Sequence, residues 1–232
     1  MNRAVIFDLY ETLVTENHPE FRTDVPPHER LGLTQEDFDR ERTAHYHARM
    51  TGKFPDYSSL LREICRACKV VPPKDEISLM QVERLAAKAR PFERVDPRII
   101  EMLQTFKRTN YRIGVISNCT YDEIAAWESS PLSKQVDVPI FSCMEGIAKP
   151  APAIYQLACD RLGIESDAVI FVGDGGSDEL NGAAAAGLKP IWATWFIEAW
   201  PWDWVTKVAG SAHTFPRCRK ISDLSILIDS MI

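Results

Sequence analysis

Two carboxylates stand directly after apolar runs that are typical of buried strands. Asp8 follows residues 4–7, and Asp174 follows residues 169–173. A carboxylate at the end of a buried strand can act as a nucleophile, and a pair of carboxylates suits Mg²⁺, which prefers oxygen ligands. Asp178 comes four residues after Asp174, at the expected start of a helix. We therefore take Asp8 as the candidate nucleophile and the other two as candidate metal ligands.

A hydroxyl, an amide and an amine follow two further apolar runs. Ser117 and Asn118 end the run at 111–117, and Lys149 comes shortly after the run at 138–143. Hydroxyl and ammonium groups can stabilise anionic charge that develops in a reaction. Singly, each residue has a simpler explanation, since Ser-Asn after a strand is most often a turn or a helix cap. Their order and spacing along the chain favour a common site.

The elements that would position these residues alternate between strand and helix. Helices are expected from Asp96 and at 122–128, 151–162 and 177–186, and strands at 3–7, 111–117, 138–143, 168–173 and 188–193. Such alternation implies right-handed βαβ units and an α/β fold with a doubly wound parallel, Rossmann-like sheet. Ligands bind such sheets at the carboxyl ends of the strands, where the candidate residues would meet.

A helical insertion interrupts this alternation. Residues 15–27 are polar and contain three prolines, and helical patterns follow at 34–50, from 58 and at 75–89, before Pro91. We predict a core domain formed by residues 1–14 and 91–232, and a small α-helical cap domain formed by residues 15–90. The segment 212–215 is expected to add a short edge strand, followed by a closing helix.

Length and composition narrow the class of protein. The 232 residues suffice for one substantial core with an insertion, and 45% are hydrophobic and 26% charged, with a formal charge of −6. No run of positive charge predicts nucleic-acid binding, and no stretch approaches the roughly 20 apolar residues of a membrane span. The six cysteines are better explained as reduced thiols than as a disulfide framework. We expect a cytoplasmic protein that acts on a small molecule.

The four stretches together resemble the motifs of the haloacid dehalogenase (HAD) superfamily. The similarity covers residues 3–14 and about 96–194, and the motifs carry in order Asp8, Ser117, Lys149 and Asp174. It implies that Asp8 attacks the substrate and forms a covalent intermediate, while Ser117 and Lys149 stabilise the charge. It also implies bound Mg²⁺, for which we assign Asp8, the main-chain carbonyl of Tyr10 and Asp174 as ligands, with Asp178 close by. Asn118 would lie beside the substrate.

Tyr10 departs from the pattern of most phosphatases in this superfamily, which carry a second Asp two residues after the nucleophile. A phenol with a pKa near 10 is seldom a base at pH 7. The intact Gly173-Asp174 still favours a Mg²⁺-dependent phosphatase that acts on a small phosphomonoester through an aspartyl-phosphate at Asp8. The alternative is a metal-independent 2-haloacid dehalogenase, because Asp-x-Tyr resembles those enzymes. A third reading is a catalytically weak binding or regulatory protein.

Two further regions have several interpretations. The segment 192–204 holds five of the six tryptophans, which could cover the sheet edge, line the site for an aromatic substrate or form a homodimer contact. Packing is the favoured explanation. In the cap, four arginines are available to contact a halide or a substrate anion: Arg22, Arg40, Arg42 and Arg49.

Overall fold

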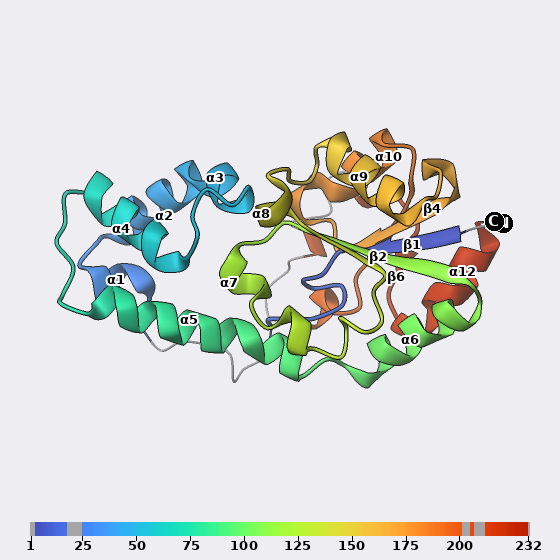
Figure 1. The fold of residues 1–232 in the computed structure, drawn as a ribbon, viewed down its shortest axis with the longest axis horizontal. Coiled ribbons are helices and arrows are strands. Elements are labelled where there is room, and N and C mark those ends of the chain that lie inside the picture. Colours follow the sequence, from blue (N-terminus) through green and yellow to red (C-terminus); the bar gives the residue numbers. More distant parts are fainter. Residues whose placement is uncertain (1–2, 18–24, 201–204, 207–211, 232) are drawn as a thin grey trace.

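A six-stranded parallel sheet forms the centre of the computed structural model, which describes residues 3–17, 25–200, 205–206 and 212–231. The strand order is β3-β2-β1-β4-β5-β6, so the chain winds outward from β1 in both directions (Figure 1). The strands are β1 (Arg3–Phe7), β2 (Tyr111–Ser117), β3 (Val138–Phe141), β4 (Val169–Gly173), β5 (Lys189–Ala193) and β6 (Arg217–Cys218). The predicted α/β fold is confirmed.

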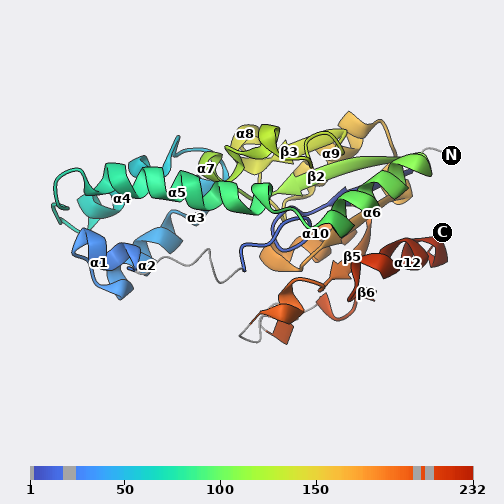
Figure 2. The ribbon, with the colours of Figure 1, turned by 90° about the horizontal axis from the view of Figure 1, so that it is seen from below.

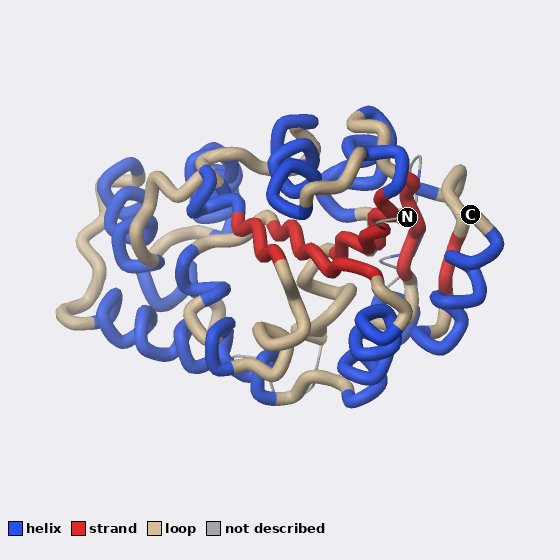
Figure 3. Tube along the Cα trace, turned by 45° about the vertical axis from the view of Figure 1, so that its right-hand side comes forward, coloured by secondary structure: helices blue, strands red, loops and turns tan. Residues whose placement is uncertain are grey.

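Helices cover both faces of the sheet, as Figure 3 shows. Successive residues of β1 point to opposite faces: Val5 and Phe7 join one hydrophobic cluster, and Ala4 and Ile6 join the other. The first cluster contains side chains of α6 (Pro97–Arg108) and α12 (Leu224–Ser230), and the second those of α9 (Pro152–Leu162) and α10 (Glu179–Ala185). Burial on both faces explains the continuous apolar runs in the sequence.

The strand register brings the ends of three strands level with one another. Phe7 at the end of β1 pairs with Val115 of β2 on one side and with Val172 of β4 on the other. Asp8 donates its main-chain N–H to the Val172 carbonyl, at 2.8 Å. The residues that follow these strands therefore gather at one edge of the sheet.

Five helices form a separate group beyond that edge (Figures 1 and 2). They have their own hydrophobic cluster, which includes Leu31, Phe38, Leu61 and Ile64. We call this group the cap; it consists of α1 (Pro27–Leu31), α2 (Gln35–Ala44), α3 (Tyr46–Met50), α4 (Tyr57–Ala67) and α5 (Glu76–Glu93). Its status as a separate domain stays a prediction.

The cap contacts the core at two places. Beside α5, Arg84 and Lys88 pair with Glu123 of the short helix α7 (Tyr121–Ile124), at 3.0 and 3.1 Å. Beside α3, the Tyr46 hydroxyl lies 3.0 Å from the Ser177 hydroxyl, in the loop after β4. The cap thus reaches the edge of the sheet where Asp8 lies.

Several elements differ from the expectation. The helix expected at 122–128 is the short α7, followed by a 3-10 turn at Trp127–Ser129. The helix expected at 34–50 is broken at His45. The helix expected to end at residue 89 is α5, which continues past Pro91 to Glu93. Proline lacks the N–H that would bond to the Ala87 carbonyl, and its ring crowds that carbonyl, but only two residues of the helix follow it, so the disturbance is confined to the last turn. The edge strand is β6 at Arg217–Cys218 and not 212–215. Short edge strands have weak sequence signals because only one neighbour pairs with them.

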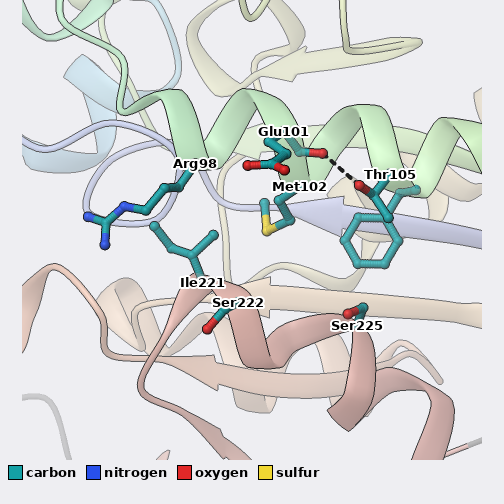
Figure 4. A pocket seen from close by; sticks show the side chains of 8 residues that line it. Arg98, Glu101, Met102, Thr105, Ile221, Ser222 and Ser225 are labelled. Atoms are coloured by element: carbon teal, nitrogen blue, oxygen red, sulfur yellow. Dashed lines mark hydrogen bonds between the residues drawn. The ribbon is translucent and has the colours of Figure 1, made fainter.

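A cavity of about 370 Å³ lies between α6 and the C-terminal segment (Figure 4). Arg98, Glu101 and Thr105 of α6 face Ser222 and Ser225 across it. No residue from the strand ends lines it, so it does not belong to the site at Asp8. Elsewhere, none of the helices in the described ranges combines the length and apolarity needed to cross a membrane.

Gly52 of the cap lies close to the main chain of the core. Its φ is +74°, and a Cβ there would lie 2.0 Å from the Cys143 carbonyl oxygen. Gly32 has φ +70° with open space around it, so Gly32→Ala should cost only the backbone strain, about 1–2 kcal/mol. Gly52→Ala should cost about 1–3 kcal/mol more in urea unfolding because of the collision. Equal losses in the two variants would contradict this close approach.

Candidate active site

Three carboxylates and one amine meet at the end of β1. Oxygen atoms of Asp8, Asp174 and Glu179 all lie within 4.8 Å of one another, and all three residues are buried. The strand ends deliver Asp8 and Asp174, and Glu179 begins α10. The Lys149 ammonium lies 2.5 Å from Asp8 Oδ1 and 2.5 Å from Glu179 Oε2. The structure thus brings together three of the residues that the sequence selected, and adds Glu179.

Lys149 is held charged by its two partners. The side chain is 2% exposed, and burial alone would lower the pKa of its ammonium. The carboxylates of Asp8 and Glu179 outweigh that effect and raise this pKa above its ordinary value. A lysine that stays protonated can stabilise negative charge on a group bound to Asp8.

Negative charge in this cluster exceeds the positive charge of Lys149. Burial, and next the charge of Asp8, raise the pKa of Asp174 to about 6. Burial also raises the pKa of Glu179 well above its usual value, although Lys149 acts against this. Carboxylates that lie this close together favour the binding of a cation, which would let them ionise together.

Glu179 occupies the place that we expected for Asp178. The Asp178 side chain is exposed and accepts a hydrogen bond from Asn181 Nδ2 at 2.6 Å, outside the acidic cluster. Ser177 and Asp178 both have φ +55°, and this left-handed turn rotates the next residue inward. Glu179 then accepts the Gly175 N–H at 3.0 Å, and a Cβ on Gly173 would lie 2.1 Å from Glu179 Oε1. The glycine leaves room for the carboxylate.

Asn118 contacts Lys149 through its whole amide group. Its Nδ2 donates to the Lys149 carbonyl at 2.9 Å, and its Oδ1 accepts the Lys149 N–H at 2.7 Å. These bonds position the loop that carries the ammonium. Ser117 is 1% exposed at the end of β2, the strand adjacent to β1, which Asp8 follows.

The Tyr10 hydroxyl is engaged in a hydrogen bond within the core and is not free for proton transfer. Its hydroxyl donates a short hydrogen bond to the Glu123 carbonyl oxygen, and its ring packs edge-on against Phe92 at 6.3 Å. Burial, followed by the charges of Glu123 and Glu16, raises the pKa of the phenol well above 10. The phenol therefore stays protonated, and its proton already has an acceptor.

Two tryptophans fix the loop that follows Asp8. Glu11 has φ +59°, a conformation that favours glycine, and its carboxylate accepts from the Thr15 hydroxyl and from Trp200 Nε1 at 2.6 and 3.1 Å. Burial raises the pKa of Glu11 to about 7. Trp195 Nε1 donates to the Thr12 carbonyl at 3.0 Å. This part of the tryptophan segment supports the loop, while Trp202 and Trp204 lie outside the described residues.

The cap arginines differ in their surroundings. Arg40 and Arg42 are exposed and pair with Asp37 and Asp39 on their own helix. Arg49 is buried where the cap meets the core, and Arg22 lies outside the described residues.

Comparison with known proteins identifies the family. The model of the haloacid dehalogenase-like hydrolases matches residues 2–187, which include all four strand ends of the site. The chain belongs to the HAD-like hydrolase family. It is therefore a hydrolase, and the fold and the order of its motifs agree with this membership.

Relatives within the family carry out two reactions. The chain is 28% identical to (S)-2-haloacid dehalogenase 4A of Burkholderia cepacia over 200 residues, which is 82% of this chain and 81% of the relative. It is 27% identical to glyceraldehyde 3-phosphate phosphatase of Pyrococcus abyssi over 96 residues, 40% and 39% of the two chains. The fold resembles L-2-haloacid dehalogenase of Xanthobacter autotrophicus, with a TM-score of 0.64 at 19% identity and full coverage of both chains.

Removing Lys149 should show how much of the site depends on its charge. Lys149→Met removes the ion-pair partner of two buried carboxylates, Asp8 and Glu179, and we expect a loss of about 3–5 kcal/mol in urea unfolding at pH 8. The loss should shrink below pH 6, because Lys149 lowers the pKa of Asp174 and of Glu179. Its removal raises both pKa values further, so protonation stabilises the variant more than the wild type.

The matched control is Arg161→Met, which breaks the exposed pair with Glu145. It should change the stability by less than about 1 kcal/mol at either pH. A Lys149→Met loss that is the same at pH 5.5 and pH 8 would contradict the account of the buried charges.

Proposed function

We propose that this hydrolase is a Mg²⁺-dependent phosphatase that acts on small phosphomonoesters. The observation that supports it is the buried excess of carboxylates: Asp8, Asp174 and Glu179 face the single ammonium of Lys149. A buried charge requires a partner, and clustered carboxylate oxygens fit a hard divalent cation. Asp8 and Asp174 would hold the ion with the Tyr10 carbonyl, and Glu179 replaces Asp178 as the nearby carboxylate. Bound Mg²⁺ would supply positive charge beside the phosphoryl group.

The chain's own residues would divide the reaction into two steps. An Asp8 carboxylate oxygen bonds to phosphorus as the ester P–O bond breaks, and water then attacks the phosphorus and releases phosphate and free Asp8. The Lys149 ammonium and the Ser117 hydroxyl stabilise the oxygens of the phosphoryl group. Asn118 positions Lys149 through its main chain and does not need to touch the substrate.

Tyr10 limits which esters are good substrates. Its proton is committed to the Glu123 carbonyl, so it does not protonate a departing alkoxide. Without a proton from Tyr10, the rate should depend steeply on the stability of the leaving anion. Aryl phosphates should therefore react faster than alkyl phosphates.

The test is turnover of 4-nitrophenyl phosphate with Mg²⁺. We expect hydrolysis that stops when the ion is chelated, and a loss of about 10³-fold or more in Asp8→Asn. Propyl phosphate should react more slowly than the aryl ester. Phosphate release that persists in Asp8→Asn would contradict the nucleophile assignment.

A second candidate function is metal-independent dehalogenation of 2-haloacids. It is favoured by the engaged phenol of Tyr10, since a departing halide needs no proton, and by the similarity to the Burkholderia cepacia dehalogenase. Chloride release from 2-chloropropionate in the presence of a chelator, without phosphatase activity, would replace the first proposal. The absence of both activities would leave the third reading, a catalytically weak binding protein.

The metal site can be tested by stability alone. Without Mg²⁺ at pH 7.5, Asp174→Asn should raise the stability of the folded protein by about 1–3 kcal/mol. The pKa of the wild-type carboxyl is raised from 3.8 to about 6 on folding, so its ionisation destabilises the folded state as the pH rises from 3.8 to 6. Adding Mg²⁺ should raise the unfolding temperature of the wild type but not of this variant.

Asp178→Asn is the control for this experiment because its carboxylate is exposed and lies outside the cluster. It should respond to Mg²⁺ as the wild type does. A Mg²⁺ response that Asp178→Asn abolishes and Asp174→Asn retains would place the ion elsewhere.

A further inference from the structure

Arg49 of α3 is a largely buried cation. Its exposed fraction is 9%, and its Nε has no hydrogen-bond partner. Among the described residues, no carboxylate forms an ion pair with its guanidinium. Burial and the neighbouring charge of Arg84 lower the pKa of Arg49, although Glu123 acts in the opposite direction. Keeping a buried charge unpaired is costly, so the surroundings of Arg49 suit the binding of an anion.

Arg49 lines a small pocket between the cap and the core. Phe54, Tyr57 and Leu60 form its apolar wall, and Thr120 lies on the core side, three residues after Ser117. Arg84 lines the same pocket, and its Nε also lacks a hydrogen-bond partner. Two guanidinium groups thus offer free N–H donors next to the end of β2.

Two carboxylates, Asp56 and Asp122, also line this pocket, and both already have hydrogen-bond partners. Asp56 accepts the Ser59 N–H at 2.6 Å as the N-cap of α4, and Asp122 accepts from Gln81 Nε2 at 2.5 Å. Glu123 pairs with Arg84 and Lys88. None of these groups neutralises Arg49.

The pocket admits only the end of an anion. Its volume is about 10 Å³, which is room for one water-sized group. One oxygen of a planar carboxylate is of that size. Arginine donors in a planar fork also match the geometry of a carboxylate.

We propose that this pocket binds a carboxylate of the substrate, remote from the bond that is cleaved, with Arg49 as its main partner and Arg84 beside it. The claim that the bound carboxylate belongs to a substrate rests on the proposed phosphatase function. The claim that the pocket binds a carboxylate does not, because it rests on the surroundings of Arg49. The cap would thereby select esters that carry a carboxylate.

The kinetic test compares phenyl phosphate with 2-, 3- and 4-carboxyphenyl phosphate. At least one carboxylate isomer should have a kcat/KM about tenfold above that of phenyl phosphate in the wild type. Arg49→Met keeps the apolar stem, removes the guanidinium and should abolish this preference. The control is Arg40→Met, since Arg40 is exposed and paired with Asp37, and it should leave the preference unchanged.

A binding test separates this proposal from the proposed function. Titration calorimetry with benzoate should give a Kd about tenfold weaker in Arg49→Met than in the wild type or in Arg40→Met. If no phosphate ester is hydrolysed but benzoate binding still needs Arg49, the phosphatase proposal fails and the carboxylate site stands. Benzoate binding that does not depend on Arg49, or a site that takes chloride and not benzoate, overturns the carboxylate site.

A stability measurement excludes a merely structural role. Because Arg49 is largely buried and forms no ion pair with a carboxylate among the described residues, the ligand-free Arg49→Met variant should be as stable as the wild type or more stable. A clear fall in its urea midpoint, matched by equal kcat/KM losses for all four esters, would instead show that Arg49 only supports the fold.

Discussion

The Lys149 ammonium, placed between Asp8 and Glu179, is the contact on which the site depends. Without it, three buried carboxylates would repel one another at the end of β1. Several features serve to keep it in place. The amide of Asn118 binds both main-chain groups of Lys149, Gly173 leaves space for the Glu179 carboxylate, and Tyr155 donates to the Glu179 carbonyl at 2.8 Å. The positive charge is thus positioned by the fold before any ligand arrives, which is the arrangement expected where charge must be stabilised during a reaction.

The sequence predicts the strand-end residues well, because parallel strands bring their carboxyl ends to one edge whatever the details of the loops. Asp8, Lys149 and Asp174 meet as expected. The exchange of Asp178 for Glu179 was not predictable, since it depends on two left-handed residues in a loop of ordinary composition. The engagement of Tyr10 with the Glu123 carbonyl likewise involves residues 113 positions apart. Helix ends inside the cap were also missed, because Pro91 in a last turn has the same sequence signal as a proline that ends a helix.

Glu123 links the cap to the loop after Asp8. Its carboxylate accepts a hydrogen bond from Arg84 and pairs with Lys88, both on α5. Burial alone would raise the pKa of Glu123. The two cations and the Thr120 N–H outweigh burial and hold this pKa below its ordinary value. Its carbonyl oxygen accepts the phenol of Tyr10. One residue of the core therefore contacts both the long helix of the cap and the residue that distinguishes this chain from most phosphatases of its superfamily. Lys88 adds a second connection, because its ammonium also lies 2.5 Å from Glu16.

The two contacts between cap and core are unequal in strength. Beside α5, charged groups that are largely buried join the two parts, and such pairs are costly to separate. Beside α3, the contact between Tyr46 and Ser177 joins two neutral hydroxyls at the surface, and one such bond contributes only about 1 kcal/mol. The ion pairs beside α5 therefore hold the cap to the core more firmly than this pair of hydroxyls does. On the α3 side the close approach of Gly52 to the Cys143 carbonyl adds van der Waals contact but no charge.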